Sequence, residues 1–444
     1  VYVLVSLHCW QIMRMKFREN AIRLFLAAVL YMRSTVSRAE DAETETAKAE
    51  LDPICTVAGS NMPPQPLNVQ RLYEKGCSTL ILQEGYHLFS SEKVLPKNLC
   101  AIKGESAKVY METELRLTCA NVTVHGSLQF KGLGRGRCVK SLDINFAQSS
   151  KVSFDGCSTI FSGGCVSAQR LVMMGSATFD NCLAARKGGA LHATRGTSIV
   201  EGASLSINNC SANEGGGIFT YGIDVAGSAE CTHCHAFKKG GGIFSYGYVN
   251  IAGITSFKHC STRCWGGGIF AEGHVTVTGT TAFQHCSALG GCETLQAKGG
   301  AIHARKDMVI ERDAKTSFVN SSAAPAEKVS GGGGIYTNGS LRVRGEAAFR
   351  DCRAGMEGGG AFSSAMLTLS ETSETTFKNC SARHGGGART YGTMQVSGRA
   401  IFENCEAHMG GGGAKARLSL NFSGNAFFNR CRSMWGGGAQ SETG

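Results

Sequence analysis

A unit of about 25 residues repeats along most of this chain, and it restricts the folds available to it. Three glycines at Gly215 are followed by Ile-Phe-Thr-Tyr-Gly, and closely related runs begin at Gly240 and Gly266. Between the glycine runs, an apolar residue with a Cys three positions later recurs, mostly every 24 to 28 residues. These pairs are Phe154/Cys157, Phe179/Cys182, Ile207/Cys210, Cys231/Cys234, Phe257/Cys260, Phe283/Cys286, Phe349/Cys352, Phe377/Cys380, Phe402/Cys405 and Phe428/Cys431, with Ser321 in place of Cys after Phe318. A fixed period of this length is typical of a solenoid.

The pattern inside one unit decides between a helical and a β solenoid. Apolar residues alternate with polar or small ones, as in Val249/Ile251 and Val275/Val277. This period of 2 is that of strands and not the 3.6 of helices. The sequence therefore predicts an all-β fold, a right-handed parallel β-helix whose coils stack about 4.8 Å apart.

Two corners are expected in each coil. Phe and Cys at positions i and i+3 would face opposite sides of a continuous strand, although both have the character of core residues. The chain must therefore bend between them. The residue before Cys is often Asn or His, as at Asn181 and His233, and Asn tolerates a left-handed turn. The glycine runs provide the second corner, where positive φ or close backbone approach excludes side chains.

Four regions are expected along the chain. Residues 1–39 have a basic segment, nine apolar residues from Leu24 to Met32 and a small-x-small site, which is the pattern of a cleaved secretory signal. Nine residues are too few to cross a bilayer, and a buried N-terminal helix is the alternative. Residues 40–70 are acidic and then Pro-rich and are interpreted as a linker. Residues 71–153 are expected to form irregular coils, and 154–444 regular ones.

Charge gives little support to a nucleic-acid partner. The formal net charge is +11, but residues 1–39 contain six basic residues and one acidic residue, which leaves +6 for the remainder. This mild surplus is weak support for an anionic partner. We therefore expect no nucleic-acid ligand and no integral membrane span in the mature region.

The recurring cysteines have three readings. Cys231 and Cys234 have the Cys-x-x-Cys spacing of zinc ligands, but each occupies a regular repeat position, and no second pair lies at zinc-finger spacing. Neighbouring ladder cysteines would lie close enough for disulfides. We favour a reduced, buried column, because interior side chains that point the same way rarely reach disulfide geometry. The additional cysteines Cys165, Cys264 and Cys292 are better disulfide candidates.

An aromatic surface is the candidate binding site. After each glycine run, Ile218 and Thr220 have the character of an inward face, so the residues of opposite parity are expected to face solvent. On three consecutive coils these outward residues are Phe219, Tyr221, Phe244, Tyr246 and Phe270. Such an exposed patch suits a sugar face or a protein partner. A covering loop or a reversed parity is the alternative.

Enzymatic function is weakly supported. Glycoside hydrolysis needs two carboxylates several Å apart, and the regular coils have no aligned Asp column. Asp224 and Asp351 are isolated and have the character of surface acids. We therefore predict no catalytic residue, no cofactor and no metal site.

The repeat motifs also resemble a known family. Gly188-Gly189-Ala190-Leu191 and Gly299-Gly300-Ala301-Ile302, alternating with the Phe-x-x-Cys elements, resemble the repeats of the polymorphic outer-membrane protein family. Residues 79–104 are similar to the start of pectin-lyase-like β-helices. The resemblance implies a secreted or surface-displayed β-helical adhesin or structural rod that binds glycans or cell-surface proteins. A polysaccharide lyase or glycoside hydrolase of the pectin-lyase-like fold is the alternative.

Overall fold

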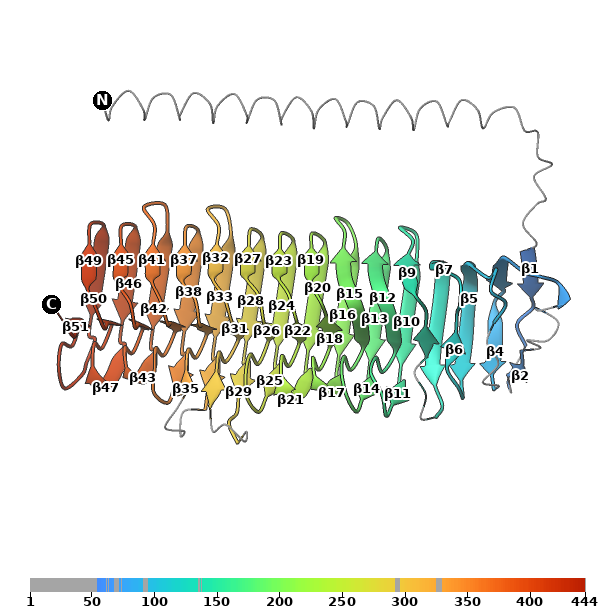
Figure 1. Ribbon diagram of the computed structural model, residues 1–444, viewed down its shortest axis with the longest axis horizontal. Helices are drawn as coiled ribbons and strands as arrows, with labels where there is room; N and C mark the ends of the chain where they lie inside the picture. The colour runs from blue at the N-terminus through green and yellow to red at the C-terminus, as the bar shows by residue number, and fades with distance from the viewer. Residues whose placement is uncertain are drawn as a thin grey trace, which may run out of the picture. The chain divides into compact units, whose positions relative to one another are not determined.

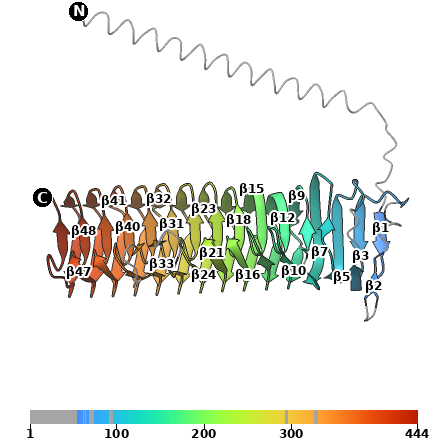
Figure 2. The same cartoon turned by 60° about the horizontal axis from the view of Figure 1, so that its bottom comes forward.

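The computed structural model describes residues 54–443 except 61, 63, 68–71, 73, 91–94, 135, 137, 292–295 and 325–329. These residues belong to one compact unit, Pro53–Gly444. Parallel strands stack in it as an all-β solenoid of about 14 turns of roughly 26 residues, which confirms the predicted parallel β-solenoid. The coils follow one another in chain order from β1 (Ile54–Val57) to β51 (Ala439–Ser441) (Figures 1 and 2). The predicted leader, residues 1–39, lies outside the described residues.

A regular coil passes through four strand positions, and each position forms a column of parallel strands. The first column, after the glycine runs, contains β18 (Ile218–Thr220), β22 (Ile243–Ser245), β26 (Ile269–Ala271), β31 (Ile302–Ala304), β36 (Ile335–Thr337), β40 (Ala361–Ser363), β44 (Ala388–Thr390), β48 (Ala414–Ala416) and β51. The second contains β19 (Ile223–Val225), β23 (Val249–Ile251), β27 (Val275–Val277), β32 (Met308–Ile310), β37 (Leu341–Val343), β41 (Leu367–Leu369), β45 (Met394–Val396) and β49 (Leu420–Phe422).

The remaining two columns carry the apolar and Cys ladder positions and the segment that leads to the next glycines. The third contains β10 (Lys151–Asp155), β13 (Ser176–Asp180), β16 (Ser204–Asn208), β20 (Ser228–Thr232), β24 (Ile254–Lys258), β28 (Thr280–Gln284), β33 (Lys315–Val319), β38 (Glu346–Arg350), β42 (Glu374–Lys378), β46 (Arg399–Glu403) and β50 (Asn425–Asn429). The fourth, a separate ten-stranded sheet, contains β11 (Ser158–Thr159), β14 (Leu183–Ala184), β17 (Ser211–Glu214), β21 (His235–Lys239), β25 (Ser261–Thr262), β29 (Ser287–Ala288), β34 (Ser322–Ala323), β39 (Arg353–Ala354), β43 (Ser381–His384) and β47 (Glu406–Gly410). A two-stranded sheet pairs β30 (Ala297–Lys298) with β35 (Ser330–Gly331).

The N-terminal coils use strands of less regular length. These strands are β2 (Gln65–Pro66), β3 (Thr79–Leu82), β4 (Gly85–Phe89), β5 (Ala101–Met111), β6 (Leu115–Arg116), β7 (Asn121–Gly132), β8 (Val139–Lys140), β9 (Asp143–Phe146), β12 (Val166–Met173) and β15 (Leu191–Ile199). β15 pairs with both β18 and β19, so a single long strand there covers the first two columns of the next coil.

The solenoid begins earlier than the sequence predicted. β1 pairs in parallel with β3, and β2 pairs with β4. A disulfide also joins Cys55 to Cys77. The linker interpretation of residues 40–70 is therefore wrong for these two strands. A proline such as Pro66 is compatible with a strand at the margin of a sheet, where its missing N–H is not needed for pairing.

The interior contains a column of stacked aromatic rings. From Phe257 to Phe428, the third-column phenylalanines lie parallel, with neighbouring ring centroids 4.7–5.1 Å apart. Ile207 and Cys231 occupy the same position in two earlier coils. Aromatic pairs contribute about 0.5–1.5 kcal/mol each beyond the burial of their area. The column therefore ties each coil to the next, as the repeat predicted.

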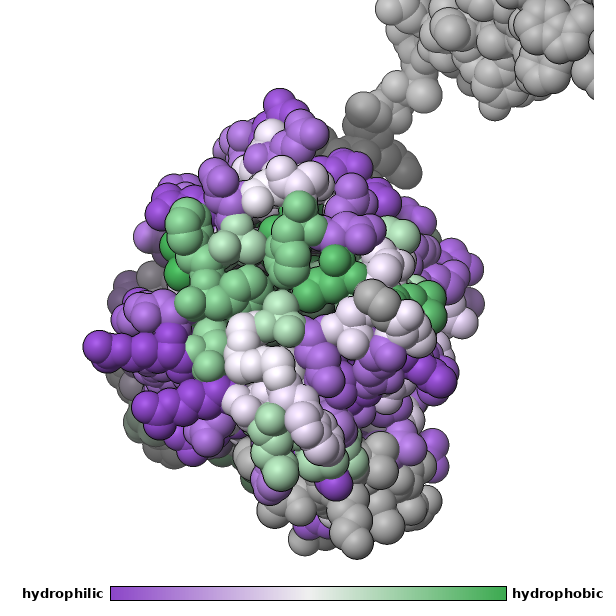
Figure 3. Space-filling model, turned by 90° about the vertical axis from the view of Figure 1, so that its left-hand side faces the viewer, coloured by the Kyte–Doolittle hydropathy of each residue, from purple (hydrophilic) through white to green (hydrophobic). Residues whose placement is uncertain are grey.

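The last coil exposes this interior. Phe422, which is in register with buried Val396, is exposed, and Leu420, Ala426, Phe428 and Cys431 are only partly buried against the core. Viewed from this end, apolar residues occupy the middle of the surface and hydrophilic residues surround them (Figure 3). The interior positions of this coil have described neighbours on one side only, which explains their lower burial.

The bend between Phe and Cys is confirmed. The residue before the ladder position has a φ of 50° to 56° in ten successive coils. These residues are Asn181, Asn209, His233, His259, His285, Asn320, Asp351, Asn379, Asn404 and Arg430. Some also bond to one another: Asn209 Nδ2 donates to Asn181 Oδ1 at 2.8 Å. Asn, Asp and His adopt positive φ more readily than most residues, so all but one of these coils have a residue suited to the left-handed turn.

The glycine runs form the second corner for two different reasons. The first glycine of a run, such as Gly240, has a φ of 64°. At the second, Gly241, an added Cβ would overlap the carbonyl oxygen of Gly267 in the next coil. The third position is less restricted, since Ala190 and Ala301 occupy it in two coils.

Substituting Gly241 tests this packing. We expect Gly241→Ala to destabilise the protein by about 1–3 kcal/mol, because the added methyl meets backbone atoms that cannot move without breaking coil pairing. The matched change at the third position, Ala301→Gly, should cost at most about 1 kcal/mol. Denaturant midpoints measure both, and equal effects of the two variants would contradict the packing argument.

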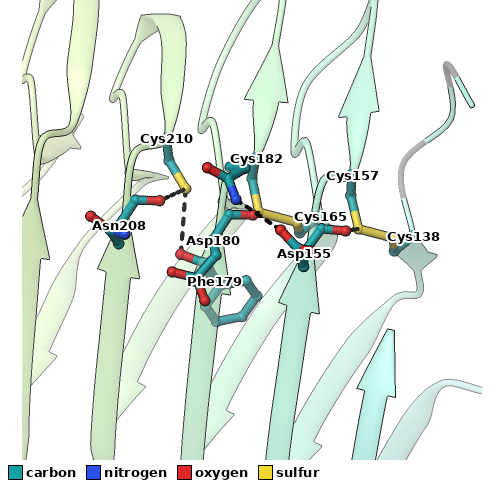
Figure 4. Close-up of a disulfide and its surroundings, with 10 residues drawn as sticks. Cys138, Asp155, Cys157, Cys165, Phe179, Asp180, Cys182, Asn208 and Cys210 are labelled. Atoms are coloured by element: carbon teal, nitrogen blue, oxygen red, sulfur yellow. Dashed lines mark hydrogen bonds between the residues drawn. A yellow bond between two sulfur atoms is a disulfide. The ribbon is translucent and has the colours of Figure 1, made fainter. Parts of the chain in front are cut away.

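Disulfides staple the N-terminal coils. They join Cys55 to Cys77, Cys100 to Cys119, Cys138 to Cys157 and Cys165 to Cys182. The prediction of a reduced column is therefore wrong for Cys157 and Cys182, while that of a bonded Cys165 is confirmed (Figure 4). Cys264 is also disulfide-bonded, as predicted, and Cys292 lies outside the described residues. Cys138 and Cys165 stand at the third glycine position, across the core from the ladder.

Further along, the ladder is reduced, as predicted. Cys210, Cys234, Cys260, Cys286, Cys352, Cys380 and Cys405 are free and buried, and Cys431 is free and half-buried. Each thiol contacts the carbonyl of the preceding coil: Cys210 Sγ lies 3.6 Å from Phe179 O (Figure 4). Burial raises the pKa of Cys210 to about 12, so the group stays a thiol. The opposite position is Ala or Gly in these coils, which leaves the ladder thiol without a partner across the core.

Ala190 offers a direct test of this pairing rule. It is the register partner of Cys165, and Cys210 follows Cys182 in the ladder. We expect the Ala190→Cys variant to form a bridge to Cys210, stabilising the protein by about 3 kcal/mol. Non-reducing peptide mapping and the denaturant midpoint, with Ala190→Ser as the control, measure this. If the introduced thiol and that of Cys210 both remain free in the variant, the rule is wrong.

Candidate functional site

The middle residue of each first-column strand faces away from the main core. Together these residues form a column of side chains on the outer side of the sheet. The strands hold these residues in strict register. The column begins at His192 of β15 and continues through Phe219, Phe244, Phe270, His303, Tyr336, Phe362, Arg389, Lys415 and Gln440. Ile218 packs in the main core instead, so the predicted parity is correct. We call this set the outer column.

The predicted exposure of the three phenylalanines is wrong. Phe219, Phe244 and Phe270 are 2%, 1% and 0% exposed and form a separate small cluster with Trp265 packed against it. The residues just before the glycine runs cover them. Lys187 Nζ lies 4.4 Å from the centre of the Phe219 ring. The glycine corner turns the chain so sharply that the preceding side chain folds over the next strand.

Two of the five predicted residues are exposed. Tyr221 and Tyr246 are 57% and 43% exposed, and their rings stack with centroids 5.5 Å apart. Tyr248 is also exposed, and its hydroxyl donates to Asp224 Oδ2 at 2.8 Å. We call Tyr221, Tyr246 and Tyr248 the tyrosine surface. Burial raises the pKa of Tyr246, and the bond to Asp224 raises that of Tyr248, so both hydroxyls remain protonated donors.

Buried rings support the tyrosine surface from below. Tyr246 packs edge-on against Phe219 at 5.5 Å and against Phe244 at 5.1 Å. The predicted patch is thus a layered structure, with phenylalanines inside and tyrosines outside. Such packing fixes the tyrosine side chains before any ligand arrives.

Charged side chains border this surface. Glu272, which is partly buried, pairs with Lys239 at 3.4 Å and with Arg305 at 2.9 Å. Lys239 Nζ also lies 4.8 Å from the centre of the Trp265 ring. Charges of both signs therefore stand within reach of a polar ligand on the tyrosines.

A histidine continues the outer column in a fully buried position. His303 lies edge-on to Phe270 and Tyr336, and both of its ring nitrogens are buried without a hydrogen-bond partner. Burial, followed by the positive charge of Lys298, lowers the pKa of His303 well below its ordinary value. The imidazole is therefore neutral and serves as a packing group.

His303 predicts how stability depends on pH. The unfolded chain protonates this residue near pH 6.5 and the folded chain does not, so stability falls as pH decreases below about 6.5. We expect His303→Phe, which matches Phe270 and Phe362 in the column, to reduce this loss by up to about 1.4 kcal/mol per pH unit. Part of the pH dependence of stability should remain in this variant, because burial also lowers the pKa of His384, to about 4.

Denaturant midpoints at pH 7.5 and pH 5 measure this effect. The exposed His408 provides the control, because His408→Asn removes a histidine that is not in the column. Equal pH dependence in His303→Phe and the unchanged protein would contradict the assignment.

Beyond Phe362 the outer column changes from aromatic to ionic. Arg389 and Lys415 are 7% and 5% exposed. Arg389 pairs with Glu357 and, at 3.4 Å, with Glu442, which Lys415 also contacts at 3.1 Å. The Tyr391 hydroxyl donates to Glu357 Oε1 at 3.2 Å. We call these five residues the ionic cluster.

The environment of the ionic cluster shifts its titration. Burial raises the pKa of Glu357, although Arg389 opposes the shift. Burial and the nearby Glu357 raise the pKa of Tyr391 to about 12. Sequence reasoning missed this cluster, but a signal was present: Ala388-Arg389-Thr390-Tyr391 aligns with Ile218-Phe219-Thr220-Tyr221 and puts a charge in an aromatic column.

Cys231 and Cys234, the zinc-like pair, are free buried thiols. Among the described residues, no group of three or more His, Cys, Asp or Glu is placed to hold a metal ion. The described part of the chain also contains no helix with the length and apolarity needed to cross a membrane. Comparison of the chain with family models, curated proteins and solved structures gives no match.

Proposed function

We propose that this protein is a secreted or surface-displayed, non-enzymatic adhesin or structural rod that binds glycans or cell-surface proteins through the tyrosine surface. The observation that carries the proposal is the stacked pair Tyr221 and Tyr246, exposed on adjacent coils and supported by buried rings. The resemblance of the repeats to those of the polymorphic outer-membrane proteins points to the same role.

The tyrosine surface has the chemistry that sugar recognition needs. Aromatic faces cover the apolar face of a sugar ring, and protonated hydroxyls with nearby Lys and Glu side chains bond to its hydroxyls. Because packing already fixes Tyr246, little side-chain entropy is lost on binding. A protein partner with an aromatic or Arg-rich contact would use the same groups.

The backbone supports a structural role. Strands of neighbouring coils pair along the whole described unit, from β1 to β51. Disulfides such as Cys138–Cys157 are typical of proteins in oxidising compartments. The reduced ladder is compatible with this location, since all its thiols except the half-buried Cys431 are buried from oxidants and disulfides.

A polysaccharide hydrolase or lyase is the second candidate, and Glu357 is the observation that favours it. Glycoside hydrolysis uses one carboxyl group of raised pKa and a second carboxylate nearby. Glu357 has the raised pKa, and Arg389 joins it to Glu442. In this candidate, turnover of a polysaccharide would be lost in Glu357→Gln.

A binding and turnover screen on the full chain tests the proposal. We expect glycan-array binding without polysaccharide turnover, and at least tenfold weaker binding for the double variant Tyr221→Ala/Tyr246→Ala, as for two exposed aromatic contacts. Tyr110→Ala, on an N-terminal coil, should bind as the unchanged protein does.

Other outcomes distinguish the candidates. Turnover that persists in the tyrosine variant and disappears in Glu357→Gln would replace the adhesin with the enzyme. Binding that is unaffected in the double variant would reject the tyrosine surface as the site.

A further inference from the structure

A trough of about 920 Å³ lies on the fourth column, in a different sheet from the tyrosine surface. It crosses β39, β43, β47 and residues 432–434 of the last coil. The first residues of four successive coils, Arg353, Ser381, Glu406 and Arg432, are in register along it. Each is followed by two more lining residues: Ala354-Gly355, Ala382-Arg383, Ala407-His408 and Ser433-Met434. Strand alternation turns the middle residue inward, so small residues form the floor and longer side chains stand on either side.

The trough carries unpaired positive charge. Arg353, Arg383 and Arg432 are exposed and, among the described residues, form no ion pair and no side-chain hydrogen bond. Elsewhere on the solenoid, arginines such as Arg305 and Arg344 each pair with a glutamate. Glu406 is the one carboxylate that lines the trough, beside Arg432 in register, without an ion pair to it within 4.0 Å.

The charge is local to these coils. At the equivalent positions of earlier coils the first residue is Ser211, His235, Ser261, Ser287 or Ser322. His235 there bonds to Ser261 at 2.9 Å, and Arg263 stacks over the Phe237 ring at 4.1 Å. The three free guanidinium groups are therefore not a general feature of this column.

We propose that this trough binds a linear anionic polysaccharide bearing sulfate or carboxylate groups. The guanidinium fork bonds to such groups through two parallel N–H donors. Because coils stack about 4.8 Å apart, close to the length of one sugar unit, Arg383 lies one coil and Arg432 three coils beyond Arg353 along the solenoid axis. An extended polymer lying along the axis can therefore reach all three arginines.

Other polyanions fit the trough less well. β39, β43 and β47 pair with their neighbours along both edges, so an acidic peptide cannot add between them as a further strand. The floor is Ala354, Ala382, Ala407 and Ser433, which gives no aromatic platform on which nucleic-acid bases stack. Small floor residues instead let sugar rings lie close to the backbone.

Binding of the full chain to immobilised heparin and polygalacturonate tests the proposal. We expect the triple variant Arg353→Ser/Arg383→Ser/Arg432→Ser to bind at least tenfold more weakly, with a shallower salt dependence, because counterion release scales with the number of contacts. Ser is the native residue at the position of Arg353 and Arg432 in other coils, as at Ser322 and Ser381, and Arg383 is exposed, so the fold should tolerate the three changes. Glu406→Ser should bind two- to fivefold more tightly.

The control removes equal charge elsewhere: Arg186→Ser/Arg342→Ser/Arg350→Ser should retain binding. Equal losses in both triple variants would show diffuse attraction and overturn the proposal. The same holds if poly-glutamate or single-stranded DNA binds the trough as tightly as the polysaccharides do. Tyr221→Ala/Tyr246→Ala should leave heparin binding unchanged, so this site and the tyrosine surface can fail independently. Denaturant midpoints confirm that each variant is folded.

Discussion

Coil-to-coil backbone pairing is the interaction on which the rest of this structure depends. Each strand bonds to its equivalent in the next coil, so paired residues lie above residues of the same repeat position. That contact is possible only if the corners admit a close approach of the backbones. Gly241 shows why, because a Cβ there would occupy the place of the Gly267 carbonyl. The ladders inside and outside the solenoid follow from this register.

Because of this register, side chains at the same repeat position contact one another from coil to coil, and each must suit its neighbours in the column. The outer column is aromatic through Phe219, Phe244 and Phe270 and becomes ionic at Arg389 and Lys415. A single buried charge in an apolar column would be strongly destabilising. Here the change occurs together with Glu357 and Glu442, which supply opposite charges to both cations. A buried cation in one coil is therefore accompanied by a carboxylate from another coil.

In the cysteine ladder, the residue across the core decides whether a Cys is disulfide-bonded or free. Cys182 is bridged because Cys165 stands across the core, while Cys210, the next in the ladder, faces Ala190 and stays a thiol. Both kinds of coil have the same strands and corners. The disulfides are thus added to a fold that coil stacking already defines. They are concentrated in the less regular N-terminal coils.

The sequence by itself determined the features that repeat. The period predicted the solenoid, alternation predicted strands, and the residue before each Cys predicted a left-handed corner that Asn209 and His233 adopt, because these depend on neighbours in sequence and on copies of the same unit. Only the tertiary structure decided that Phe219 is covered while Tyr221 is exposed, because the side chain that covers Phe219 is Lys187, from another coil. The ionic cluster, the bridge at Cys182 and the arginine trough likewise join residues that differ between coils, and a repeat pattern does not record such differences.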